Sequence, residues 1–177
     1  MLALPGAVFV YNGEELGLPN VDLPDDALQD PVWERSGHTE RGRDGCRVPL
    51  PWSGDVAPYG FSASTDTWLP MPADWGPVTV EAQSGDPAST LTLFQRAIGL
   101  RRARGRLGRT VHWLSSEPDV LAFRGEDGLV CVLNAGETAV RLPTGKVLLS
   151  SGPLTAGDLP PDTAVWLTGS AVDSGAE

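Results

Sequence analysis

Hydrophobic and polar residues follow three different patterns along the 177-residue chain. Residues 7–11 (AVFVY) form a continuous apolar run of β-branched and aromatic residues, which is typical of a strand buried on both faces of a parallel sheet. Residues 12–85 show no sustained helical or strand period, and this segment is far longer than a usual loop of about 4–6 residues. Because it carries several tryptophans, we expect it to be an ordered loop that contributes to function.

A helix is predicted over residues 87–104. Asp86 is the expected N-cap, and Pro87 suits the first turn because its missing N–H would have no partner there. Apolar residues then recur at helical spacing, and Gly105 is expected to end the helix.

Beyond the helix, the apolar pattern changes to a two-residue alternation in short runs separated by turn residues. This pattern predicts an antiparallel β-sandwich over residues 106–170, whereas the small and acidic residues 171–177 are expected to form a flexible tail. Trp113, Phe123 and Trp166 are expected in the core of this domain. The predicted strands are residues 110–114, 120–124, 129–134, 139–142, 146–150 and 164–168.

Composition and charge narrow the function classes. A net charge of −10 argues against general binding of nucleic acid or of anionic membranes, and no apolar run approaches the ~20 residues of a transmembrane helix. The N-terminus also lacks the basic start of a signal peptide, so we expect a cytoplasmic protein. Cys46 and Cys131 lack zinc-ligand spacing and are expected to be free thiols. The acidic residues 22–30 could hold a calcium ion, but they lack the alternation and the glycine of an EF-hand, so a solvated acidic loop is favoured and no metal is expected. No cofactor is expected either.

Two sequence motifs carry a family resemblance. YNGEELG at residues 11–17 resembles the YQGEE motif that closes the eighth barrel strand in the alpha-glucosidase and oligo-1,6-glucosidase branch of glycoside hydrolase family 13. GRDGCRVPLPW at residues 42–52 resembles the RDGxRxPMPW loop of that branch, with Leu50 where Met is common. The resemblance continues through DPASTL at residues 86–91 and through VLAFRGEDGLVCVLNAG at residues 120–136.

The resemblance implies an α+β chain in which residues 1–105 are the remnant of a (β/α)₈ barrel, comprising its eighth strand, a long loop and its last helix. It also implies a retaining reaction on alpha-glucoside oligosaccharides, in which two carboxyl groups about 5 Å apart act as nucleophile and as general acid and base. In the family those groups come from the fourth and fifth strands, and a sugar-binding Asp comes from the seventh. We therefore expect no catalytic residue in this chain and no activity of the chain alone.

The expected substrate-lining residues are Tyr11, Glu14, Arg43, Asp44 and Arg47. Adjacent carboxylates on an extended segment point to opposite sides, so Glu14 and its neighbour Glu15 are not an acid/base pair. Three choices between substrate contact and structure stay open at this point. Glu14 or Glu15 could contact sugar or form hydrogen bonds with the backbone. The charged residues 43–47 could border the substrate or only stabilise their own loop. Trp52 could stack on a sugar ring or pack inside the loop.

Two other functions also remain open. The chain could be a non-catalytic carbohydrate-binding or interaction module, although the C-terminal part has few aromatic residues for a sugar platform. It could instead complement a separately encoded N-terminal barrel portion. Binding of maltose or isomaltose by residues 106–177 alone would favour the first of these alternatives.

Overall fold

The computed structural model describes residues 1–105, 107–114 and 117–168, which form two compact units. The loop unit is Val10–Phe94, and the sheet unit joins Met1–Phe9 to the chain from Gln95 onward. Helix α3 (Thr90–Ala103) begins in the loop unit and ends in the sheet unit. The two compact units therefore divide inside this helix, between Phe94 and Gln95. The domain boundary expected near residue 105 stays a prediction. The expected tail, residues 171–177, lies outside the described residues.

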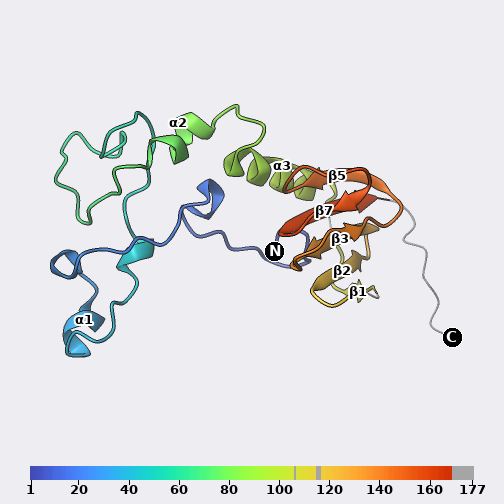
Figure 1. The fold of residues 1–177 in the computed structure, drawn as a ribbon, viewed down its shortest axis with the longest axis horizontal. Helices are drawn as coiled ribbons and strands as arrows, with labels where there is room; N and C mark the ends of the chain where they lie inside the picture. Colours follow the sequence, from blue (N-terminus) through green and yellow to red (C-terminus); the bar gives the residue numbers. More distant parts are fainter. Residues whose placement is uncertain (106, 115–116, 169–177) are drawn as a thin grey trace. The chain divides into compact units, whose positions relative to one another are not determined.

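The sheet unit contains a five-stranded antiparallel sheet in the order β1-β2-β3-β7-β5 (Figure 1). A second, two-stranded antiparallel sheet pairs β4 with β6. All six strands expected from the alternating pattern are confirmed, whereas β6, with only two residues, is too short to produce a visible alternation. The strands are β1 (Val111–Trp113), β2 (Val120–Gly125), β3 (Leu129–Asn134), β4 (Val140–Arg141), β5 (Lys146–Ser150), β6 (Asp158–Leu159) and β7 (Thr163–Thr168).

One face of the five-stranded sheet forms the core of the sheet unit. Alternate residues of β2, β3 and β7 point to this face, and Leu159 of β6 packs against them. Full burial of a Val or Leu side chain contributes about 1.5–3 kcal/mol, so this cluster is the main stabilising contact of the unit. The buried cluster is Ala122, Val130, Val132, Leu159, Val165 and Leu167. The mixed helices and antiparallel strands confirm the α+β class, and the sandwich form of the domain stays a prediction.

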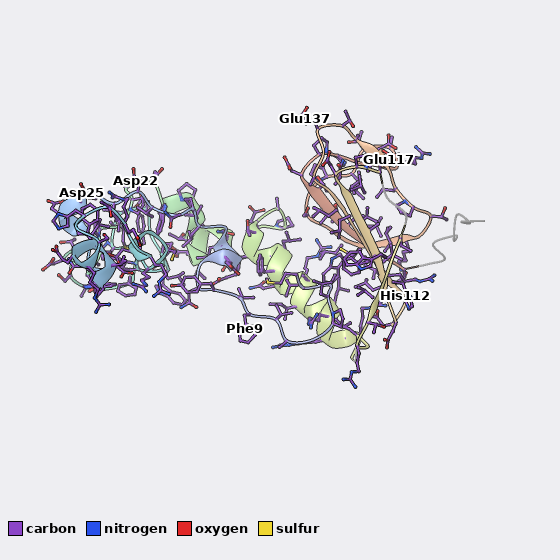
Figure 2. All side chains as sticks on the ribbon, turned by 90° about the horizontal axis from the view of Figure 1, so that it is seen from below. Phe9, Asp22, Asp25, His112, Glu117 and Glu137 are labelled. Atoms are coloured by element: carbon purple, nitrogen blue, oxygen red, sulfur yellow. The ribbon has the colours of Figure 1, made fainter. Side chains whose placement is uncertain are left out.

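The prediction of a strand over residues 7–11 is wrong. The backbone there belongs to no strand, because a parallel strand obtains its hydrogen bonds only from neighbouring strands, and every strand pair in the described residues is antiparallel. The guanidinium of Arg101 instead donates to the Leu2 carbonyl at 2.7 Å and to two further carbonyls of the N-terminal segment. Phe9 is 85% exposed and its side chain projects from this segment (Figure 2).

Helix α3 confirms the predicted helix with a different start. The N-capping oxygen belongs to Ser89, whose Oγ accepts from the backbone N–H of Thr92 at 3.1 Å. Asp86 bonds the N–H of Ala88 at 2.9 Å in the turn before the helix, so the expected capping role of Asp86 is wrong. Beyond the helix, Arg104 forms an ion pair of 2.6 Å with Asp127 in the β2–β3 hairpin.

The long loop expected over residues 12–85 folds around its own small core. Tyr59 is fully buried, and its hydroxyl donates to the Pro72 carbonyl at 2.8 Å and accepts from the Trp75 N–H at 3.2 Å. The Gln83 side-chain amide donates to the Leu16 carbonyl at 2.8 Å, which closes the loop over 67 residues. The short helices of the unit are η1 (Glu14–Leu16), η2 (Asp25–Ala27), α1 (Pro31–Arg35), η3 (Asp44–Cys46), η4 (Gly76–Val78) and α2 (Val80–Gln83).

None of the helices in the described part of the chain has the length and apolar character needed to cross a bilayer.

Candidate functional site

Asp44 anchors the charged loop at residues 42–47 to a neighbouring segment of the chain. This carboxylate is fully buried, and its Oδ2 accepts the backbone N–H groups of Gln29 at 2.6 Å and Asp30 at 2.7 Å. Its Oδ1 has no hydrogen-bond partner among the described residues, and the Nη1 of Arg47 lies 3.6 Å away. Asp44 therefore joins the charged loop to the segment that precedes helix α1.

Asp30 connects the same two segments from the other side. One of its oxygens caps helix α1 by accepting the Val32 N–H at 3.1 Å, and the other accepts the Arg43 N–H at 3.2 Å and the Arg47 Nη1 at 2.9 Å. The hydrogen bond from Val32 and the one from Arg43 hold the pKa of Asp30 below its usual value, and the positive charges of Arg47 and Arg43 lower it further. Asp30 is thus a charged anchor for the Arg47 guanidinium.

Two glycines allow this close packing. Gly42 has a φ of +72°, and a Cβ there would lie 2.7 Å from side-chain atoms of Asp30 and Val32. A Cβ at Gly45 would lie 2.4 Å from the carbonyl oxygen of Val21, whose own N–H donates to the Gly45 carbonyl at 2.9 Å. Both glycines of the GRDGCR motif are therefore required by close contacts, with side chains at Gly42 and with backbone at Gly45.

The YNGEE motif forms a tight turn that ends in η1. The Glu14 carboxylate accepts the Tyr11 N–H at 3.2 Å, and the Glu15 carboxylate accepts the Gly13 N–H at 2.9 Å. Both carboxylates thus bond the backbone of their own turn, which is the structural alternative that the sequence left open.

The two motifs meet at two cavities in the loop unit. The smaller cavity, of about 180 Å³, includes Glu14 and Trp75 in its wall. The larger, of about 410 Å³, is lined by Arg47 and by four aromatic side chains, those of Tyr11, Trp52, Phe61 and Trp68. Both walls include Tyr11, Asn12, Cys46 and Val48, so residues from both motifs border both cavities.

The expected site residues take different positions at these cavities. Tyr11 borders both of them, Glu14 borders the smaller one, and Arg47 borders the larger one. Arg43 has an exposed side chain that forms no ion pair within the described residues and lies in neither wall, and the buried Asp44 lies in neither wall as well. The sequence analysis did not identify Phe61 and Trp68 as site residues. Their only indication in the sequence is that each is a large aromatic residue within a polar segment.

Two other polar residues of the loop unit, His38 and Arg41, have structural partners. His38 stacks on Trp33 with ring centroids 4.7 Å apart, and its Nε2 lies 3.2 Å from Glu34. Arg41 pairs with Asp22 and Asp25, two exposed residues of the acidic segment that are labelled in Figure 2. In the part of the chain that the structure describes, no three His, Cys, Asp or Glu side chains gather at a point suited to a metal ion.

The two cysteines are free thiols, as the sequence predicted. Cys46 is exposed in the walls of both cavities, whereas Cys131 lies in β3, where burial raises its pKa to about 11.

Comparison with known proteins gives consistent matches. The family profile of the alpha amylase catalytic domain matches residues 1–109. A probable alpha-glucosidase of Rhizobium meliloti is 34% identical over 143 residues, which are 78% of this chain and 26% of that protein. An oligo-1,6-glucosidase of Parageobacillus thermoglucosidasius is 26% identical over 165 residues, 79% of this chain and 29% of that protein.

A solved structure of an alpha-glucosyl transfer enzyme superposes with a TM-score of 0.75 at 28% identity, and the match covers 94% of this chain and 33% of that one. This chain therefore spans about a quarter of the length of the curated relatives and a third of the solved enzyme.

Proposed function

The chain belongs to the alpha-amylase catalytic-domain family, and we propose that it forms one wall of the substrate site of an alpha-glucosidase-type glycoside hydrolase. The observation that carries the proposal is that the YNGEE and GRDGCR motifs, about 30 residues apart in sequence, line the same two cavities. The substrate class is an alpha-glucoside oligosaccharide, because the curated relatives are named alpha-glucosidase and oligo-1,6-glucosidase.

The polar residues in and near the walls of the two cavities suit the binding of sugar hydroxyls. Arg47 lines the larger cavity and is held in place by Asp30, whereas Arg43 lies in neither wall and has an exposed guanidinium with donors free of ion pairs within the described residues. Tyr11 and Glu14 supply a hydroxyl and a carboxylate at the smaller cavity. Asp44 is buried, so its proposed role is to position the loop that carries the two arginines.

We propose further that the 177-residue chain does not hydrolyse glycosides by itself. Retention needs two carboxyl groups about 5 Å apart on either side of the scissile bond. The walls of the two cavities include one carboxylate, that of Glu14, and it already accepts the Tyr11 N–H. The nucleophile and the acid would come from other strands of a complete barrel, whether on the same polypeptide or on a partner chain. A cytoplasmic location is part of the same proposal.

Hydrolysis assays test both parts of the proposal. The chain alone should release no product from p-nitrophenyl alpha-glucoside or isomaltose, and turnover that Glu14→Gln abolishes would contradict this. A chimera that joins the chain to the preceding barrel strands of the Rhizobium meliloti relative should be active. In the chimera, Arg43→Ala should lower kcat/KM about 100-fold, because a charge-assisted contact to substrate is worth about 1.5–3 kcal/mol. Arg141→Ala, which alters an exposed ion pair of the sheet unit, is the matched control.

One observation favours the alternative of a non-catalytic carbohydrate-binding module. Trp113 was expected in the core together with Phe123 and Trp166, but it is 65% exposed, whereas the other two are buried. Its ring forms a T-shaped pair with that of Phe123, with centroids 5.8 Å apart and an angle of 74° between the ring planes, and most of the Trp113 surface stays exposed. If this surface binds sugar, Trp113→Ala should abolish maltose binding measured by calorimetry.

A further inference from the structure

Strand β1 forms one edge of the five-stranded sheet, and its outer side has no partner among the described residues. The Leu114 N–H donates to the Ala122 carbonyl at 3.0 Å, and hydrogen-bonded pairs alternate with non-hydrogen-bonded pairs along an antiparallel ladder. His112 therefore bonds β2, whereas the backbone groups of Val111 and Trp113 point away from it. The edge thus offers two N–H groups and two carbonyls to another strand.

The two edges of the sheet differ in how they are protected against such pairing. At the other edge, β5 begins with the exposed Lys146, and its register against β7 shifts between Val147 and Leu149. Charged side chains and bulges of this kind keep a second sheet from pairing with an edge. β1 has a regular register with β2, contains no lysine or proline, and carries the exposed ring of Trp113. It is therefore an open edge, suited to pair with an extended strand.

The charges on either side of β1 indicate which strand fits this edge. Arg109 lies before β1 and Glu117 after it, and both are exposed and form no ion pair within the described residues. Figure 2 shows Glu117 toward the end of the sheet that carries Glu137, away from His112. Antiparallel pairing of two identical strands brings the basic end of β1 in one copy toward the acidic end in the other, twice by symmetry. Parallel pairing would bring like charges together instead.

We propose that β1 is a self-association edge, at which two copies of the chain pair antiparallel through their β1 strands with the contact centred on His112. In this register Val111 of each copy exchanges both backbone hydrogen bonds with Trp113 of the other, which uses every outward group of the edge. A contact through three residues per copy buries far less than the ~1,200 Å² of a stable interface. The dimer should therefore be transient, with a dissociation constant on the order of 100 µM.

Sedimentation equilibrium of the 177-residue chain, over concentrations from about 10 µM to about 1 mM, tests the contact. Val111→Pro removes an N–H that points outward and leaves the bonds to β2 in place, and edge strands tolerate proline at such positions. Association should weaken about 10-fold or more, because two of the four hydrogen bonds across the contact are lost, one in each copy. Urea denaturation checks that this variant is folded.

A charge exchange tests the antiparallel direction without altering the backbone. Arg109→Glu and Glu117→Arg should each weaken association about 5-fold, because each turns two attractive contacts into repulsive ones. The double variant should restore the affinity of the unaltered chain. Arg141→Glu, at an exposed residue of the same unit, is the matched control for the change in net charge and should leave association unchanged.

Amide hydrogen exchange, followed by NMR at low and at high concentration, gives an independent readout. The N–H groups of Val111 and Trp113 should become protected as the concentration rises, whereas that of His112 should be protected throughout. The proposal is overturned if the chain stays monomeric up to about 1 mM, or if Val111→Pro associates like the unaltered chain. It is overturned as well if the double charge variant is as weak as the single ones. Hydrolysis by the chimera involves no such contact and tests the proposed function separately.

Discussion

Removal of the Asp44 carboxylate is expected to detach the charged loop from the segment before helix α1. Asp44 is fully buried and accepts two backbone N–H groups, at 2.6 and 2.7 Å. A hydrogen bond to a charged group contributes about 1.5–3 kcal/mol, so Asp44→Ala, which leaves both N–H groups without an acceptor, should lower the free energy of unfolding by about 4 kcal/mol. Asp44→Asn keeps one oxygen for both donors and loses the charge, so we expect a loss of about 2 kcal/mol.

Urea denaturation followed by tryptophan fluorescence measures these losses, since the loop unit contains Trp33, Trp52, Trp68 and Trp75. With a urea dependence of about 2 kcal/mol/M, Asp44→Asn should lower the midpoint by about 1 M. Asp26→Asn in η2 is the matched control, because this exposed residue forms no ion pair among the described residues and should change stability by less than about 0.5 kcal/mol. The reasoning fails if Asp44→Asn and Asp26→Asn have the same midpoint, or if Asp44→Ala is as stable as the unaltered chain.

Three further results are expected. At pH 8 a thiol reagent should add once to the folded chain, at Cys46, because Cys131 is buried with its pKa raised to about 11; intact mass spectrometry showing two additions before unfolding would contradict this. Tyr59→Phe removes the hydroxyl that bonds two backbone groups and should cost about 2 kcal/mol by urea denaturation, so an unchanged midpoint would refute that role. Asp30 has a lowered pKa in the folded state, so its contribution to stability is present above its unfolded pKa, near 3.8, and is lost as the pH falls through the folded pKa. Asp30→Asn should therefore destabilise the chain at pH 7 and much less in acid, and a difference that stays constant with pH would oppose this.

The elements that the sequence predicted correctly are those with a local cause. The strands after residue 110 follow from two-residue alternation, and helix α3 follows from helical spacing with a glycine at its end. The errors arise where several polar residues compete for the same role. Asp86 and Ser89 both suit an N-cap, and only the three-dimensional position of the helix start decides that Ser89 binds the Thr92 N–H.

The strand expected at residues 7–11 shows a second kind of error. Its composition favours a buried parallel strand, but composition cannot provide the neighbouring strands whose hydrogen bonds such a strand requires. Trp113 shows the same limit, because alternation places its side chain on one face of β1 without showing whether another element covers that face.

The two motifs predicted five residues at the site, and three of them, Tyr11, Glu14 and Arg47, line the cavities. Their contact with substrate stays a prediction. Asp44 and Arg43 belong to the same motif, yet one is buried and the other exposed, because η3 turns adjacent side chains in different directions. Phe61 and Trp68 carry no motif, so only the folded loop identifies them as part of the site.

By itself, the sequence determined the family, the antiparallel strands and the last helix, because motif identity and hydrophobic period are properties of short stretches of chain. Only the tertiary structure decided which charged residues support the loop and which line a cavity, and that exposed aromatic rings gather at one cavity. Those properties depend on burial and on contacts between residues far apart in sequence, such as the bond of Gln83 to Leu16, and no local pattern records them.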